Sequence, residues 1–71
     1  MKKKLPIVNK VRQCRESKDA MTQSELGALV FVTRQTIAAI EQGRYSPSLE
    51  TAFRIARVFD LGFEDIFSWH E

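Results

Sequence analysis

The amino-acid sequence predicts an all-α fold of five short helices. Apolar residues recur along the chain at helical spacing. Capping residues, glycines and prolines separate the periodic segments. The length of 71 residues allows a single domain, over residues 1–71, with a thin core. A core this small favours a partner chain or a very regular packing of helices.

The composition is that of a soluble globular domain, with 44% hydrophobic and 28% charged residues. The longest apolar run, Ala28 to Val32, is too short to cross a bilayer. The lysines at positions 2–4 are followed by polar Asn9 and Lys10, so no secretory signal is expected. A single cysteine, Cys14, excludes an intramolecular disulfide and fits a reducing compartment. We therefore expect a cytoplasmic protein without a membrane partner.

Charge is distributed unevenly along the chain. The balance is +6 over residues 1–18, −1 over residues 19–46 and −3 over residues 47–71. A basic N-terminal segment and an acidic C-terminal segment fit a polyanionic partner that binds one side of the protein only. A solvated lysine tail would produce the same charge pattern, so charge alone leaves both readings open.

The first helix is expected from Val8 to Lys18, with Val8, Val11 and Cys14 on one face, and "KDAM" ends it. Thr22 then caps a second helix, because "TQSE" is a capping box in which Thr22 and Glu25 satisfy each other's backbone donors. The buried positions expected for this helix are Leu26, Leu29 and Val30.

After a turn at Phe31 and Val32, Thr33 is expected to cap a third helix that ends at Gly43. Ser48 caps a fourth, the most apolar, whose apolar positions are Leu49, Ala52, Phe53, Ile55, Ala56 and Phe59; Glu50 is favourable in its first turn. A short fifth helix covers about Phe63 to Phe67. The tail "FSWHE" alternates apolar and polar residues, which favours a strand.

The third helix has an unusual outward face. At 100° per residue, Ile37, Ile40 and Glu41 point to one side. The other side carries Gln35, Ala38, Ala39 and Gln42, flanked by Arg34 and Thr36. Amides and guanidinium groups pair with base edges and phosphates, and alanines keep the helix narrow. This face therefore predicts insertion into the major groove of double-stranded DNA.

Residues 23–42 read as helix, tight turn and helix, with small Gly27 where the two helices would touch. The run "TQSELGALVFVTRQTIAAIEQGRYSPSLETAFRIA" resembles the lambda-repressor-like, Xre-type helix-turn-helix family over nearly the whole chain. The resemblance implies a five-helix DNA-binding domain and a transcriptional regulator.

The resemblance also implies roles for particular residues. Gln23 would contact phosphate or brace the third helix, and the groove would be faced by Thr33, Arg34, Gln35, Thr36 and Ala39. Phosphate contacts from the following loop would come from Arg44, Tyr45 and Ser46, although Tyr45 could equally be a packed loop aromatic. Arg15 would pair with Glu41, which lies on the buried face and needs a partner.

Three positions depart from the family pattern. Phe31 stands where a glycine is usual, and a positive φ there would cost about 1–2 kcal/mol. If the turn takes another form, its exposed ring would be an interaction point. Asp60 replaces the glycine usual after the fourth helix, and Gly62 replaces a serine-like cap. The loop "SKDAM" is also one residue longer than the common form.

Other chemistry is weakly represented. Cys14 lies on the expected core face of the first helix. His70 has no further histidine or cysteine nearby in the sequence at the spacing of a metal site. We predict no catalytic residues, no metal, no cofactor and no small-molecule ligand, and hence no enzyme. The expected function is a transcriptional repressor that occupies a palindromic operator. The alternative is an antitoxin-like module that neutralises a protein partner and binds DNA secondarily.

A homodimer is expected, because one recognition helix reads too few bases to select one site in a genome. Ile66 and Phe67 would complete the core, which leaves Leu61, Phe63 and Trp69 in the segment 61–71 for a partner. The chain also resembles short repressors of the cytolysin-regulator type, in which the termini form a β-ribbon. By that analogy "KKL" before Pro6 would pair with "FSWH". The alternative is a frayed tail with Trp69 folded onto its own domain.

Overall fold

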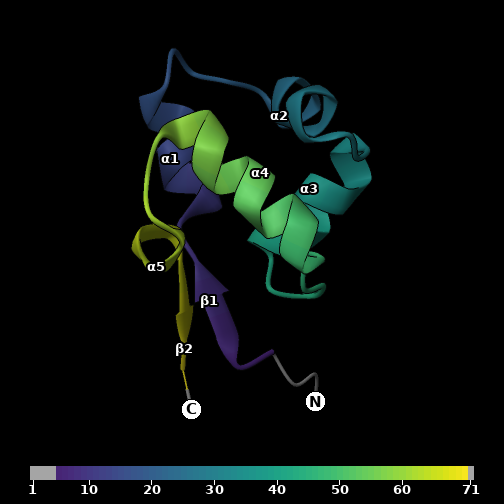
Figure 1. The fold of residues 1–71 in the computed structure, drawn as a ribbon. Coiled ribbons are helices and arrows are strands. Elements are labelled where there is room, and N and C mark those ends of the chain that lie inside the picture. The colour runs from purple at the N-terminus through teal and green to yellow at the C-terminus, as the bar shows by residue number, and fades with distance from the viewer. Residues whose placement is uncertain (1–4, 71) are drawn as a thin grey trace.

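The computed structural model describes residues 5–70 (Figure 1). Its elements in order are β1 (Ile7–Asn9), α1 (Val11–Ser17), α2 (Gln23–Val30), α3 (Arg34–Glu41), α4 (Leu49–Phe59), α5 (Phe63–Ile66) and β2 (Phe67–Trp69). The expected fold class, five helices with a two-stranded antiparallel ribbon, is confirmed.

Local capping chemistry determines where the middle helices begin. The Thr22 hydroxyl accepts a hydrogen bond from the Glu25 amide at 3.0 Å, and the Glu25 carboxylate accepts one from the Thr22 amide at 2.8 Å. Thr33 caps α3 and Ser48 caps α4 in the same way, each through the amide three residues further on. These contacts confirm the predicted starts of α2, α3 and α4, because each satisfies a backbone donor that a helix leaves unpaired.

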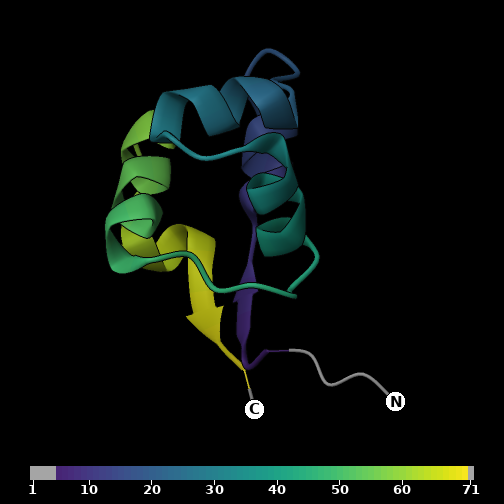
Figure 2. The same cartoon turned by 90° about the vertical axis from the view of Figure 1, so that its right-hand side faces the viewer.

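The core lies between the helices and the base of the ribbon. Figure 2 shows α2 across one end of the molecule, α3 and α4 on either side below it, and the ribbon extending from the other end. The buried apolar residues are Val11, Leu26, Val30, Ile37, Ile40, Ala52, Ile55, Ala56, Ile66 and Phe67. Ile66 and Phe67 complete this core as predicted, at 2% and 4% exposure.

The start of the chain differs from the prediction. Val8 belongs to β1 and not to the first helix, which begins at Val11. The paired strand follows Pro6 instead of preceding it, with Ile7 opposite Trp69 and Asn9 opposite Phe67. Proline has no N–H to donate to a ladder, so it stands before the first strand residue. Of the predicted strand "KKL", Lys3 and Lys4 lie outside the described residues.

One helix boundary and one burial prediction also change. Helix α5 ends at Ile66, and Phe67 already belongs to β2. Leu29 was expected in the core but is 52% exposed. The buried positions of α2 are Leu26, Gly27 and Val30, and the backbone of Val32 and Thr33 packs directly against Gly27. Leu29 lies about 110° from the centre of the buried face at 100° per residue.

Two residues other than glycine adopt the left-handed backbone conformation, with positive φ, directly after a helix. Phe31 follows α2 with φ 66°, and Asp60 follows α4 with φ 54°. Phe31 is 75% exposed, and the Arg54 guanidinium lies 4.6 Å from the centre of its ring. The turn therefore keeps the left-handed form, and a cation–π contact with α4 offsets part of the strain.

Candidate nucleic-acid interface

Helices α2 and α3 meet closely because Gly27 has no side chain. A Cβ at this position would lie 2.7 Å from the carbonyl oxygen of Val32 and 3.3 Å from the backbone of Thr33. No larger residue fits without moving the backbone. The glycine thus sets the short distance at which the turn places the start of α3 against α2.

Helix α3 buries its apolar side and presents its polar side. Ile37 and Ile40 are buried at 0% and 1% exposure. Arg34 and Gln35 are exposed in the first turn, and Thr36 and Ala39 are partly exposed beside them. Within residues 5–70, no carboxylate forms an ion pair with Arg34. The first turn therefore offers a guanidinium and an amide to an external ligand.

The threonines at the start of α3 have a structural role that is visible in the contacts. The Thr33 hydroxyl accepts from the Thr36 amide at 3.2 Å, and the two hydroxyls lie 3.1 Å apart. Thr33 itself is exposed. Both side chains thus shape the first turn while remaining at the surface.

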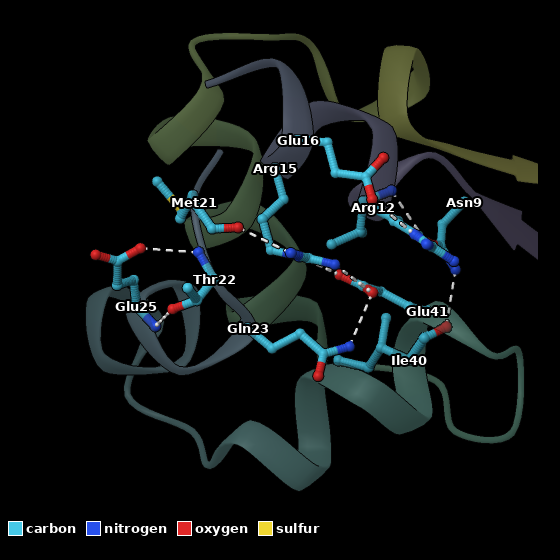
Figure 3. A network of polar contacts seen from close by, with 11 residues as sticks. Asn9, Arg12, Arg15, Glu16, Met21, Thr22, Gln23, Glu25, Ile40 and Glu41 are labelled. Atoms are coloured by element: carbon cyan, nitrogen blue, oxygen red, sulfur yellow. Dashed lines mark hydrogen bonds and ion pairs between the residues drawn. The ribbon is translucent and has the colours of Figure 1, made fainter. Parts of the chain in front are cut away.

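At its other end, α3 is held by a polar cluster that joins three helices (Figure 3). Arg15 of α1 donates through Nε to Glu41 Oε2 at 2.8 Å and through Nη2 to Glu41 Oε1 at 3.0 Å. The Gln23 amide of α2 donates to the same Oε1 at 3.1 Å. Arg15 also donates to the carbonyl of Met21. Gln23 therefore braces α3, and its second amide hydrogen remains for another acceptor.

Little solvent reaches this ion pair. The side chains of Arg15 and Glu41 are 12% and 5% exposed. The hydrogen bond to Glu41 raises the pKa of the Arg15 guanidinium above its usual value. The two parallel hydrogen bonds between Arg15 and Glu41 therefore tie α1 to the end of α3 at a site that is largely shielded from water.

The end of α3 is a glycine-dependent turn that leads into an exposed loop. Gly43 has φ 75°, its amide donates to the Ile40 carbonyl, and the Arg44 amide donates to the Ala39 carbonyl. This pair of bonds is the Schellman motif that ends many helices. Arg44, Tyr45 and Ser46 follow directly and are all exposed. Their side chains therefore lie beside the end of the exposed face of α3.

Of the three residues expected at a dimer interface, Phe63 and Trp69 line one depression and Leu61 lines another. Phe63 and Trp69 line one depression with Leu49, and the ring centre of Phe63 is 5.6 Å from that of Phe53. Leu61 lines a different depression, beside Cys14 and Phe59. The apolar face, which we define as Leu49, Phe53, Phe63 and Trp69, is thus partly different from the set that the sequence suggested.

Sequence reasoning missed Leu49 and Phe53 as surface residues, because it grouped all apolar positions of α4 without separating buried from exposed ones. They are 69% and 51% exposed. A signal was available, because these two residues lie four apart on one side of the helix, about 120–160° from the buried Ile55 at 100° per residue.

Residues 5–70 offer neither a metal site nor a membrane-spanning helix. No group of three or more histidine, cysteine, aspartate or glutamate side chains there is placed to hold a metal ion. None of the helices in this part of the chain has the length and apolarity needed to span a bilayer.

Fold and surface together define a helix-turn-helix domain: two helices joined by a tight turn, the second presenting an exposed polar face. The sequence model described as "Helix-turn-helix" matches residues 11–66. A relative from Archaeoglobus fulgidus, named an uncharacterised HTH-type transcriptional regulator, is 53% identical over 51 residues, covering 72% of each chain. The similarly named YgzD of Bacillus subtilis is 48% identical over 63 residues, covering 89% of this chain and 92% of its own.

A solved structure agrees at the level of the fold. The crystal structure of a candidate DNA-binding protein from Bacteroides fragilis superposes with a TM-score of 0.74, covering 87% of this chain and 98% of its own, at 14% identity. The chain therefore belongs to the lambda-repressor-like, Xre-type helix-turn-helix family, whose members are DNA-binding transcriptional regulators.

Proposed function

We propose that the chain is a transcriptional repressor that binds a palindromic operator in double-stranded DNA as a homodimer. The observation that carries the DNA-binding part is the exposed first turn of α3, with Arg34 and Gln35 free at the surface and Glu41 turned inward. In this proposal, the groove is faced by Thr33, Arg34, Gln35, Thr36 and Ala39, and Gln23, Arg44, Tyr45 and Ser46 contact phosphates.

Base contacts and phosphate contacts make different predictions for mutants. Gln35→Ala removes a bidentate partner for a base and weakens binding to the preferred sequence by about 1–3 kcal/mol, with less effect on other DNA. Arg44→Ala removes a phosphate contact, weakens binding to all sequences, and reduces the salt slope by about one.

The test begins with a selection from a random pool of double-stranded DNA, followed by binding of the selected sequence at fixed salt. Gln13→Ala is the matched control for Gln35→Ala, because Gln13 is also an exposed glutamine but lies on α1. If the pool yields no preferred sequence, or if Gln35→Ala keeps the wild-type preference, the proposed recognition is wrong. Transcription in vitro from a promoter that carries the selected site then tests repression, and an increase in transcript contradicts it.

The dimer rests on the apolar face. Its four side chains, Leu49, Phe53, Phe63 and Trp69, are between 37% and 69% exposed, which is costly for a free monomer of this size. Pairing two copies through this face would give two recognition helices, for half-sites roughly 34 Å apart. Leu61 lines a different depression and stays a predicted contact of the dimer.

Analytical ultracentrifugation at micromolar concentration tests the interface. Leu49→Glu should give monomers, because it places a charge in the centre of the buried contact. Leu29→Glu is the control, since Leu29 is an exposed leucine of α2 outside the apolar face. A wild-type chain that sediments as a monomer, or a dimer that survives both Leu49→Glu and Phe63→Ala, contradicts the proposed interface.

A further inference from the structure

Strand β1 contacts the end of the recognition helix through one side chain, that of Asn9. Its amide nitrogen Nδ2 donates to the carbonyl oxygen of Ile40 in α3 at 2.9 Å. Its Oδ1 accepts from the Val11 amide at the start of α1 at 3.1 Å. Figure 3 shows the Asn9 side chain reaching α3 from the side opposite Gln23.

The two partners fix which way the Asn9 amide points. The Val11 N–H is only a donor, and the Ile40 carbonyl is only an acceptor. A flipped amide would set donor against donor and acceptor against acceptor, so neither bond could form. Asn9 is therefore matched at both ends, and it joins β1, α1 and α3 with a single side chain.

The Ile40 carbonyl is a sensitive place for such a contact. It already accepts from Gly43 in the turn that ends α3, at 3.0 Å, and Asn9 uses its second lone pair. The next residue of the turn, Arg44, opens the exposed loop. The backbone beyond this turn contacts the N-terminal segment once more, where the Leu5 amide donates to the Gly43 carbonyl.

Asn9 is itself well anchored. Its backbone pairs with Phe67 of β2, which is buried, and the next amide, that of Lys10, donates to the Ile66 carbonyl at 2.9 Å. The side chain thus connects the end of α3 to a part of the molecule that the core holds in place.

We infer that Asn9 is a positioning residue for DNA recognition. It holds the end of α3 and the loop with Arg44 at a fixed place relative to the ribbon, and it does not touch DNA. The inference rests on the proposed function. Phosphate contacts set the register of a protein on the duplex, so a loosened loop weakens binding without removing any DNA-contacting group.

Asn9→Ser separates the two bonds. Serine can still accept from the Val11 amide as a capping residue, but its side chain is too short to reach the Ile40 carbonyl. Asn9→Asp keeps the acceptor and lacks the donor, and Gln13→Glu is its control for the added charge. We expect Asn9→Ser to bind the selected DNA about five- to tenfold more weakly than wild type. We expect Asn9→Asp to bind it more weakly than Gln13→Glu by the same factor. A factor of this size corresponds to about one lost hydrogen bond.

A local readout distinguishes positioning from general stability. Amide hydrogen exchange at Gly43 and Arg44 should accelerate in both Asn9 variants, while the core amides of Leu26 and Val30 keep their protection. Binding is measured where circular dichroism shows wild-type helix content.

Each outcome decides the inference. It is overturned if folded Asn9→Ser binds like wild type, if exchange changes equally throughout the chain, or if both Asn9 variants unfold. Gln35→Ala in the same assay keeps the two proposals apart. If Gln35→Ala alone weakens binding, the positioning role fails and the proposed function stands, whereas failure of the wild-type chain to select DNA removes the proposed function itself.

Discussion

Replacing Glu41 with alanine removes the carboxylate on which two other helices converge. Arg15 loses both of its bonds to Glu41, at 2.8 and 3.0 Å, and keeps only its bond to the Met21 carbonyl. Gln23 loses its acceptor at 3.1 Å. The Arg15 side chain is only 12% exposed in the wild-type structure, so water can hydrate the guanidinium only poorly once Glu41 is removed.

The expected cost follows from this geometry. Breaking a buried ion pair by removing one partner costs about 3–5 kcal/mol. The remaining bond of Arg15 places the loss near the lower limit, at about 3 kcal/mol. A chain of this length has a free energy of unfolding of about 4–10 kcal/mol, so the mutant loses a third or more of its stability. The melting temperature should fall by roughly 10–25 °C.

Urea unfolding followed by circular dichroism measures the effect. The double change Arg15→Met with Glu41→Leu should recover much of the loss, because an apolar pair needs no desolvation. Glu16→Ala is the matched control. It breaks an Arg–Glu pair with Arg12 at 2.9 Å whose side chains are 71% and 54% exposed, and we expect no measurable change. An unchanged urea midpoint in Glu41→Ala would refute the reasoning, since the pair would then contribute nothing to stability.

Three further predictions concern other positions. Gly27→Ala should lower the free energy of unfolding in urea by about 1–3 kcal/mol, because the added Cβ meets the backbone of Val32 and Thr33. Gly43→Ala should lower it by only about 1 kcal/mol, because a Cβ there meets no atom and the cost comes from the φ of 75° alone. Phe31→Gly should shift the thermal melt little, since relief of about 1–2 kcal/mol of strain offsets the lost contact with Arg54, whereas Phe31→Val should clearly lower it. Burial raises the pKa of the Cys14 thiol, so the unfolded chain ionises first above about pH 8.5 and stability falls as pH rises further. Cys14→Ala should lack this part of the pH dependence in urea midpoints compared at pH 7 and in alkaline buffer.

Much of the helical architecture could be predicted because the deciding interactions are local. Thr22, Thr33 and Ser48 each accept from an amide three residues further on, so the start of each helix can be recognised within four letters of sequence. The turn at Gly43 likewise ends α3 through local bonds: the Gly43 amide donates to the carbonyl three residues before it, and the Arg44 amide donates to the carbonyl five residues before it. The polar face of α3 followed from the helical period alone.

The errors occurred where distant parts of the chain decide the structure. Val8 has no local feature that prevents a helix, and it becomes a strand residue because it lies opposite Ser68 at the other end of the chain. Leu29 fits the helical period of a buried position, yet α2 packs through Leu26, Gly27 and Val30, and Leu29 is 52% exposed. Periodicity places residues on a helix face but does not say how the helix is rotated against its neighbours.

The sequence by itself determined the starts of α2, α3 and α4, the glycine turn after α3, the helix-turn-helix pair and the polar surface that α3 presents, because these depend on hydrogen bonds and periodicity among neighbouring residues. Only the tertiary structure decided which apolar residues share a surface, separating Leu61 from Phe63 and Trp69 and adding Leu49 and Phe53. It also decided that Asn9 contacts Ile40, 31 positions away. Such contacts depend on how whole elements pack, and packing is determined by the shape of the complete core.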